Sequence, residues 1–411
     1  MLYHLGDYGG AERNFKTAVK YSSSKVEGYL ELASFYLKIA ENEKALETYR
    51  NALDEDPDDI RPALGAAGLC FSSGDTATAD SICLSLMEKN RDSVQSLNSL
   101  ISAFYALDRL DLAEKAAKRT AELLPNDVDM QRRYAFTLFG NGNFAAAESV
   151  MVALDNRDMA NGLIYYYLGR LVQRREDFSA AEDYFKKSVA FDDTITYSWI
   201  NLAVVTDAQG RYEEAIEIMH RAYDKIPADS LEVMYYTAII HSRNERYDLA
   251  RDGYLRLTES QPDNIDIRFN LAASYERLGQ FKEAEREFYW IMERAPDHAL
   301  ALNYLGYMYA DKGIKLDEAL PMIEKAVSID PENGAFLDSY AWVLYKLGRY
   351  DEALVQMKEA LKYDQSDAVL YDHQGDIYTA LTSHELAKES WIKALEIDPD
   401  NKEIKAKLNL K

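Results

Sequence analysis

An alanine recurs at an almost constant interval along the whole chain. The interval is 34 residues nine times and 35 residues twice. The recurrent residues are Ala11, Ala45, Ala79, Ala113, Ala147, Ala181, Ala215, Ala250, Ala284, Ala319, Ala353 and Ala387. A fixed period of about 20 to 50 residues is the sequence signature of repeat architectures, in which each unit packs on its neighbours. The 411 residues are therefore expected to form an array of similar units.

Each repeat contains two amphipathic helices joined by a short turn. The second helix surrounds the recurrent alanine, as in KLGRYDEALVQMKEALKYD, and a glycine-centred turn precedes it. The first helix lies upstream, as in IRFNLAASYERLG, with apolar residues at i, i+3, i+4 and i+7. Prolines such as Pro57, Pro125 and Pro399 are expected to end the hairpins, because proline lacks an N–H and restricts the residue before it.

The point where the two helices of a hairpin cross requires small side chains on both helices, because antiparallel helices approach closely only there. In the first helix this crossing position is alanine or glycine in every repeat but one, which has isoleucine. The residues are Ala33, Ala67, Ile101, Ala135, Gly169, Ala203, Ala238, Ala272, Gly306, Ala341 and Gly375. The pattern predicts an all-α chain built from helix–turn–helix units.

A hairpin of 34 residues with small residues at positions eight and twenty, an aromatic or apolar residue at twenty-four and proline at thirty-two resembles the tetratricopeptide repeat family. The resemblance covers essentially the whole chain, and residues 299–401 are most similar to bacterial members. It implies a solenoid of helical hairpins wound into a right-handed superhelix. Eleven complete repeats are expected over residues 26–401, with a truncated first repeat at 1–25 and a capping helix at 402–411.

The charge balance limits the classes of partner. Lysine and arginine number 47 against 70 aspartates and glutamates, a net charge of -23 that repels nucleic acid and anionic lipid. No apolar run is long enough to span a bilayer, and the first residues lack the pattern of a signal peptide. The chain is expected to be soluble, without nucleic acid partners or direct membrane insertion. Cytoplasm and bacterial periplasm both remain open, the second if an export signal lies upstream.

The resemblance implies that first helices line the inner surface of the superhelix with their second, fifth, ninth, twelfth and thirteenth residues. These positions are rich in aromatic and arginine side chains, which offer large contact areas with few rotatable bonds to immobilise. We expect a groove for a protein or peptide lined by Phe71, Tyr105, Arg132, Phe136, Tyr166, Arg170, Arg174, Tyr197, Tyr235, Arg243, Phe269, Asn303, Tyr307, Trp342 and Tyr345. The competing interpretation is that several of these residues pack within or between repeats.

Charges are distributed unevenly along this predicted groove, which could set the direction of a bound peptide. Its N-terminal half carries Arg61, Arg132, Arg170 and Arg174, and its C-terminal half carries Asp311, Asp338, Asp372 and Asp376. Ordinary solvated charge is the alternative. Two binding codes of the family, a lysine–asparagine carboxylate clamp and an asparagine ladder at the sixth position, are not matched. The sixth positions are Glu31, Gly65, Ser99, Arg133, Tyr167, Asn201, Tyr236, Asn270, Tyr304, Ser339 and His373.

Sequence motifs for catalysis, nucleotide binding or metal binding are not found, so we expect no enzyme activity, no catalytic residue, no metal and no cofactor. Asp372, His373 and Asp376 share one helix face and are interpreted as a polar patch. Cys70 and Cys83 should face each other across one hairpin. A buried reduced pair is favoured, and a disulfide is the alternative if the chain is exported.

Three functional hypotheses follow. The first is a non-catalytic scaffold that binds a peptide or helix of a partner in its concave groove. The second is a regulatory or assembly arm of a larger cell-envelope complex or enzyme, whose anchoring or catalytic part lies upstream. The third is a self-assembly module that forms a homo-oligomer through an uncapped N-terminal end, since residues 1–25 begin in mid-repeat.

Overall fold

The computed structural model describes residues 7–408, and within that range the secondary structure is helical, without strands. The first helices of the repeats are α2 (Lys25–Lys38), α4 (Ile60–Ser72), α6 (Val94–Ala106), α8 (Val128–Gly140), α10 (Gly162–Gln173), α12 (Thr196–Ala208), α14 (Ser230–Arg243), α16 (Ile265–Arg277), α18 (Ala299–Lys312), α20 (Gly334–Lys346) and α22 (Ala368–Ala380).

The second helices are α1 (Tyr8–Tyr21), α3 (Asn42–Glu55), α5 (Thr76–Lys89), α7 (Leu110–Leu123), α9 (Phe144–Asp155), α11 (Phe178–Phe191), α13 (Tyr212–Lys225), α15 (Tyr247–Ser260), α17 (Phe281–Arg294), α19 (Leu316–Ile329), α21 (Tyr350–Tyr363) and α23 (His384–Ile397). A 3₁₀ turn, η2 (Pro227–Asp229), precedes α14, and a short helix, α24 (Lys402–Lys407), packs on α23. Of the expected capping segment, residues 409–411 lie outside the described residues.

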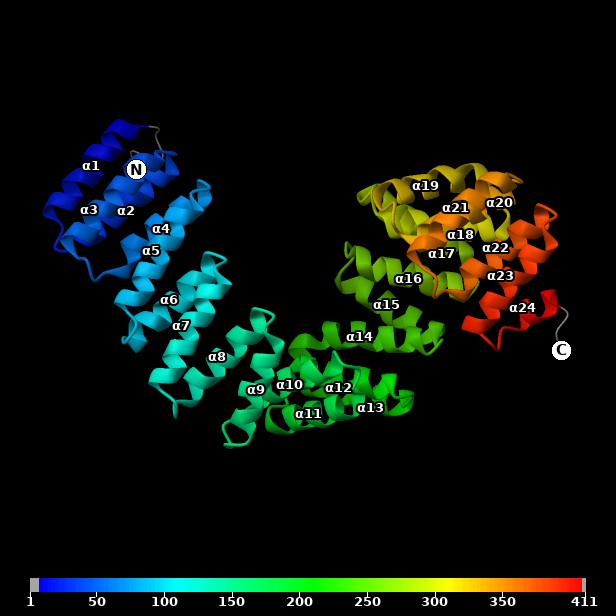
Figure 1. The fold of residues 1–411 in the computed structure, drawn as a ribbon, viewed down its shortest axis with the longest axis horizontal. Coiled ribbons are helices and arrows are strands. Elements are labelled where there is room, and N and C mark those ends of the chain that lie inside the picture. Colours follow the sequence, from blue (N-terminus) through cyan, green and yellow to red (C-terminus); the bar gives the residue numbers. More distant parts are fainter. Residues whose placement is uncertain (1–6, 409–411) are drawn as a thin grey trace. The chain divides into compact units, whose positions relative to one another are not determined.

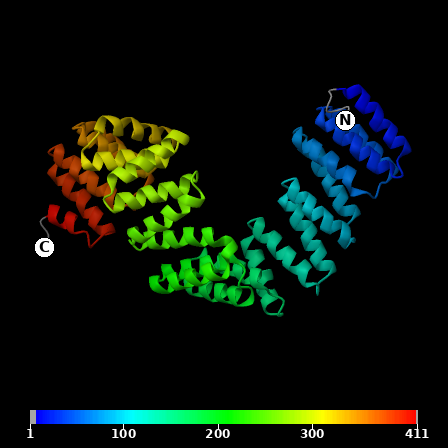
Figure 2. The ribbon, with the colours of Figure 1, turned by 180° about the vertical axis from the view of Figure 1, so that it is seen from behind.

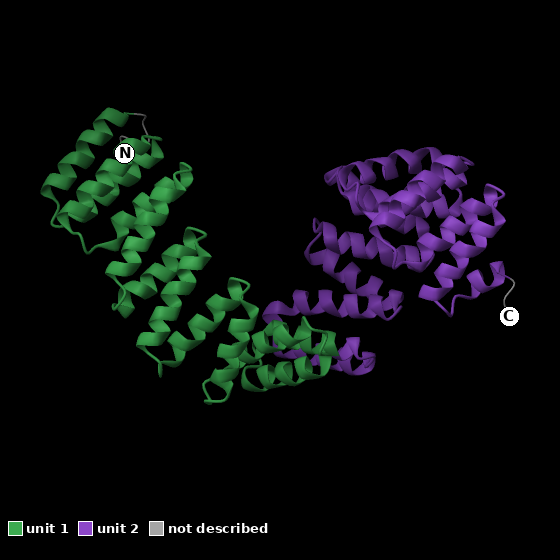
Figure 3. Cartoon of the chain, viewed as in Figure 1, with its two compact units in different colours: residues 1–205 green, residues 206–411 purple. Residues whose placement is uncertain are grey.

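The chain divides into two compact units, residues 1–205 and 206–411 (Figure 3). Within each unit, consecutive helices pack antiparallel in chain order, so that each hairpin stacks on the next (Figures 1 and 2). In the second unit the first helices also contact one another directly, α18 against α20 and α20 against α22. Residues on neighbouring first helices of a unit can therefore meet across repeats.

The predicted crossing points are confirmed by burial. Each recurrent alanine is at most 4% exposed. Where the first helix has glycine, the facing ring or branched chain fills the space, and a Cβ at Gly375 would lie 2.3 Å from Trp391 Nε1. The exception, Ile101, is fully buried in one cluster with Ala113, Ala116 and Ala117 of α7, whose small side chains accommodate it.

The turn between the two helices of a hairpin uses a left-handed residue at the fifteenth position of each repeat. Six of these residues are glycine, as expected, and the other five are Ala40, Asp108, Glu176, Glu245 and Thr382, all with φ between 55° and 61°. A non-glycine residue in this conformation costs roughly 1–2 kcal/mol. Helix packing on both sides of the turn therefore sets its geometry even where glycine is absent.

Candidate functional site

The residues predicted to line a groove lie on first helices or at their C-terminal ends, but they differ in exposure. Tyr105 and Tyr197 are 41% and 46% exposed, and Arg174 and Arg243 are also exposed. The half-buried residues are Phe71, Arg132, Phe136, Arg170, Tyr235, Phe269, Asn303, Tyr307 and Tyr345.

Tyr166 and Trp342 do not fit the prediction, because they are only 8% and 7% exposed. The Tyr166 ring lies 6.1 Å from the ring of Phe185 on α11. The Trp342 ring stacks between His373 and Tyr345, with centroid separations of 3.9 and 4.9 Å. The expectation that these two rings line an open groove is therefore wrong, because they fill the space between packed helices.

In the first unit, α8 and α10 together carry a cluster of rings and arginines, which we call the α8–α10 face. It consists of Arg133, Phe136, Phe139, Tyr167, Arg170 and Arg174, all half-buried or exposed. The ring of Tyr167 on α10 contacts the rings of Phe136 and Phe139 on α8, at 5.3 and 4.6 Å. Burial raises the pKa of Tyr167, so its hydroxyl stays neutral at physiological pH.

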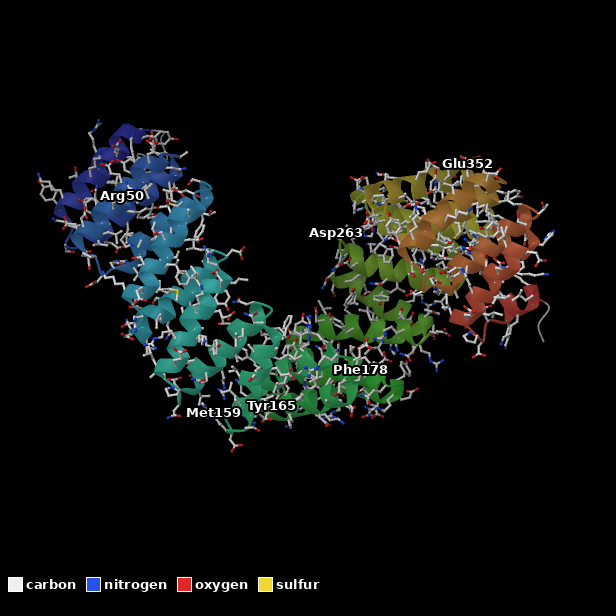
Figure 4. All side chains as sticks on the ribbon, in the orientation of Figure 1. Arg50, Met159, Tyr165, Phe178, Asp263 and Glu352 are labelled. Atoms are coloured by element: carbon white, nitrogen blue, oxygen red, sulfur yellow. The ribbon has the colours of Figure 1, made fainter. Side chains whose placement is uncertain are left out.

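The arginines of this region are held by neutral partners. Arg133 donates to Asn98 Oδ1 on α6 at 3.1 Å, and Arg170 donates to the Tyr166 hydroxyl at 2.9 Å. The Arg174 guanidinium lies 4.0 Å from the ring centroid of Phe144. Arg132, by contrast, is turned toward the loop before α10, where its Nε donates to the carbonyl of Met159 at 2.8 Å (Figure 4 labels Met159).

In the second unit, a buried ion pair links two first helices. His373 Nδ1 on α22 lies 2.8 Å from Asp338 Oδ1 on α20, and each side chain is only 8% exposed. Burial, the largest influence, lowers the pKa of His373, but the charge and hydrogen bond of Asp338 more than compensate. The net effect raises the pKa of His373 above the usual value for histidine.

The next aspartates along this surface are paired in the same way. Lys407 Nζ on α24 donates to Asp372 Oδ1 at 2.7 Å and to Asp376 Oδ2 at 2.8 Å. Asp372 and Asp376 are thus ion-paired within the chain, as is Asp338. His373 and Lys407 thus pair with three of the four aspartates considered as the acidic end of the groove, which reduces the proposed charge segregation.

The remaining predicted residues mostly contact side chains of other repeats. Phe269 contacts the rings of Phe288 and Tyr304, Tyr235 accepts a hydrogen bond from Asn270, and Arg243 pairs with Asp207 at 3.6 Å. The Phe71 ring is covered by the Arg109 guanidinium, and the Tyr307 ring centroid lies 6.3 Å from that of His373. The buried Oδ1 of Asn303 has no hydrogen-bond partner among the described residues.

Three hollows of the described chain lie between consecutive second helices, with the intervening first helix as their floor. One, of about 570 Å³, is formed by α1, α2 and α3, one of about 360 Å³ by α13, α14 and α15, and one of about 370 Å³ is lined from α5, α6 and α7. Residues 7–408 contain no cluster of three metal-ligating side chains and no helix with the length and apolarity to cross a bilayer.

Models of the tetratricopeptide repeat match five stretches of this sequence, residues 2–60, 198–231, 254–286, 315–374 and 368–401. The chain is a tetratricopeptide repeat protein. The matched stretches occur in both units and agree with the repeated hairpins of the structure.

Relatives of this tetratricopeptide repeat protein share low identity with it. It is similar to the TPR repeat-containing protein PA4667 of Pseudomonas aeruginosa (26% identity, 48% of this chain and 33% of the relative). It is also similar to the Hsp70-Hsp90 organizing protein of Triticum aestivum (24% identity, 57% and 41%). The chain thus spans less than half the length of these relatives. Among solved structures, yeast Tom70 aligns with 99% of this chain and 91% of its own at 16% identity, with a TM-score of 0.49.

The sixth position of the tetratricopeptide repeat has a role that its residue types alone did not reveal. Arg133, Asn270 and His373 occupy this position, and each bonds to the fifth residue of the preceding repeat, 35 residues earlier. Lys407 reaches Asp372 over the same interval. The sequence signal for this role is a pair of complementary polar residues 35 positions apart. An asparagine-ladder pattern at the sixth position does not contain that signal.

The two cysteines are free thiols buried within the first unit. Burial raises the pKa of Cys83 to about 11 and also raises that of Cys70. Thiolates are the reactive form of cysteine, so both residues are poorly suited to redox or metal chemistry in the folded chain. They serve as small packing residues of the hairpin formed by α4 and α5.

Proposed function

We propose that this chain is a non-catalytic scaffold that binds a peptide or helix of a partner protein on the first-helix surfaces of its repeats. The observation that carries the proposal is the exposure of aromatic and arginine side chains on these helices, above all Tyr105, Tyr197 and Arg174. Side chains of this kind dominate the energetics of protein interfaces, because they bury a large area and lose few rotamers.

Membership of the tetratricopeptide repeat family supports the proposal. Stacked hairpins expose extended surfaces made of corresponding positions in successive repeats, and such surfaces suit an extended ligand. The wheat relative is named as an organizing protein for two other proteins, which is an example of a scaffold role. The family and the burial of the chain's polar clusters point to protein interaction rather than catalysis.

Site-specific photo-crosslinking tests which helices bind the partner. Benzoylphenylalanine replaces Tyr105 or Tyr197 on first helices, and Tyr223 or Tyr363 on second helices as matched controls, since all four side chains are 41–46% exposed. The full chain is irradiated in cells that express it, and adducts are identified by mass spectrometry. We expect partner adducts at Tyr105 and Tyr197 only. Equal yields at all four positions, or adducts confined to the second helices, would refute the proposal.

A further inference from the structure

Four first helices of the first unit, α4, α6, α8 and α10, are almost free of acidic residues, although the chain has 70 of them among 411. Asp129 is the single acidic residue in α4, α6, α8 and α10, which also contain four arginines. The second helices packed against them, α5, α7, α9 and α11, each carry two or three acidic residues. These four helices therefore carry a net positive charge within a strongly anionic protein.

The arginines of the α8–α10 face also lack the carboxylate partners that several arginines outside this face have. Arg119 and Arg175, outside this face, each lie 2.6 Å from a carboxylate oxygen, of Asp92 and Glu148. No carboxylate lies within ion-pair distance of Arg133, Arg170 or Arg174 in the part of the chain that the structure describes. Their charges are oriented by an amide, a hydroxyl and a ring, and are left uncompensated.

A purely structural explanation accounts for only part of this arrangement. Arg174 follows the last turn of α10, where a cation interacts favourably with the helix dipole. Arg133 lies in the middle of α8, where the dipole offers nothing, and its bond to Asn98 links two repeats without neutralising its charge. Nor does packing require arginines on a surface where Phe136, Phe139 and Tyr167 already contact one another.

We propose that the α8–α10 face binds a segment of a partner protein in which aspartate or glutamate residues flank an aromatic or branched aliphatic side chain. This inference rests on the proposed function and narrows the ligand. The acidic groups would pair with Arg170 and Arg174 at the rim, and the apolar side chain would lie on the rings of Phe136, Phe139 and Tyr167. Charge-assisted hydrogen bonds from arginine to carboxylate are stronger than those to neutral acceptors. The acidic ligand would therefore supply the carboxylate partners that these arginines lack within the chain.

Arginines and aromatic rings also suit single-stranded nucleic acid, whose bases stack on rings. The observations favour the acidic peptide, because a net charge of -23 and acidic second helices beside the face repel a long phosphate backbone. A short acidic peptide, unlike a long nucleic acid, would place its negative charges only at the α8–α10 face and not beside the acidic second helices. Nucleic acid therefore enters the experiment as a competing probe.

Fluorescence anisotropy with the full chain tests the inference. The probes are synthetic peptides of equal length with acidic residues around phenylalanine, basic residues around phenylalanine, or acidic residues around alanine. A single-stranded RNA of mixed sequence is the fourth probe. Each peptide is made with a free and an amidated C-terminus. We expect only the acidic phenylalanine peptide to bind, equally with either terminus, and more weakly as salt is added.

The variant R170Q/R174Q should weaken this binding roughly tenfold, since it removes two partly exposed charge contacts. The matched control R157Q/R175Q changes the net charge equally but alters arginines whose partners lie outside the face, Pro125 and Glu148. Circular dichroism checks that both variants fold. Equal weakening by both variants, tighter binding of RNA or basic peptide, or binding by no probe would overturn the inference. If basic peptides crosslinked to first-helix positions, the proposed function would stand and only the ligand class would be wrong.

Discussion

Replacing His373 with leucine should destabilise the second unit more than any exposed substitution. The imidazole and the Asp338 carboxylate are 2.8 Å apart and each is only 8% exposed, so solvent screens their interaction little. Removing the histidine leaves a buried carboxylate without its counter-charge, which typically costs about 3–5 kcal/mol. The double variant D338L/H373L removes both charges and should recover most of that loss, because an apolar pair of similar volume avoids the desolvation penalty.

The pH dependence follows from the direction of the pKa shift. The folded chain holds the pKa of His373 above the unfolded value of about 6.5, so the folded state binds the proton more tightly. The stabilisation is complete below that pH and is lost as pH rises through the folded pKa. The charges of Asp372 and Asp376, which Lys407 bridges, also act on His373, so the quantity to compare is the difference between wild type and H373L. This difference should shrink as the pH rises above about 6.5.

Urea unfolding across this pH range, with hydrogen exchange of α20 and α22 as the local readout, measures the effect. His241 supplies a matched control, because burial lowers its pKa and the difference between wild type and H241L should grow with pH. A difference for H373L that stays constant with pH would show that folding leaves the pKa of this histidine unchanged, and one that grows with pH would show that the folded chain holds it neutral. A loss below about 1 kcal/mol, or a double variant no more stable than H373L, would refute the buried-pair reasoning.

Three further predictions concern packing and capping. Gly375→Ala should destabilise the chain by about 1–3 kcal/mol, because the new Cβ would lie 2.3 Å from Trp391 Nε1. The matched control Gly140→Ala, whose Cβ has its nearest contact at 3.9 Å, should be neutral or stabilising. Thermal unfolding of both variants measures the difference. Lys407→Met leaves two partly buried carboxylates unpaired, so it should lower the free energy of unfolding by about 1–3 kcal/mol. Hydrogen exchange of the α24 amides should become faster, and unchanged exchange would contradict this prediction. Cys83, fully buried with a pKa of about 11, should react with a disulfide reagent at pH 8 far more slowly in the native chain than in denaturant.

The hairpins could be predicted from the sequence because the same packing constraint recurs in every repeat. A crossing point admits only small side chains, so alanine or glycine marks it wherever the helices meet, and burial of the alanines confirms this. The turn was predicted only where glycine occurs. Asp108 and Glu176 adopt the same left-handed conformation because the helices on either side impose it, and tertiary constraints of that kind leave no local signal.

The candidate site was less predictable, because position in a repeat does not determine whether a side chain is exposed. Tyr105 and Trp342 both occupy inner positions, yet Tyr105 is exposed and Trp342 is stacked between two rings. The difference lies in the neighbouring repeats. His373 and Tyr345 supply flat partners for Trp342, whereas Gly140 on the next first helix leaves Tyr105 uncovered, 3.9 Å from where a Cβ would be. Only the contacts between repeats decide such cases.

The charged residues of the α8–α10 face and those of α20 and α22 differ in whether the chain itself pairs them, and this contrast determines which chemistry remains for a partner. In the second unit, Asp338, Asp372 and Asp376 are each matched by a cation one repeat later, so their charges stabilise the stacking of repeats. On the α8–α10 face, Arg170 and Arg174 have no such carboxylate match among the described residues. A charge that is already paired within the chain must give up that pairing before it can pair with a ligand. An uncompensated charge, by contrast, is stabilised when a ligand of opposite charge binds. Selection of an acidic partner should therefore depend on the α8–α10 face.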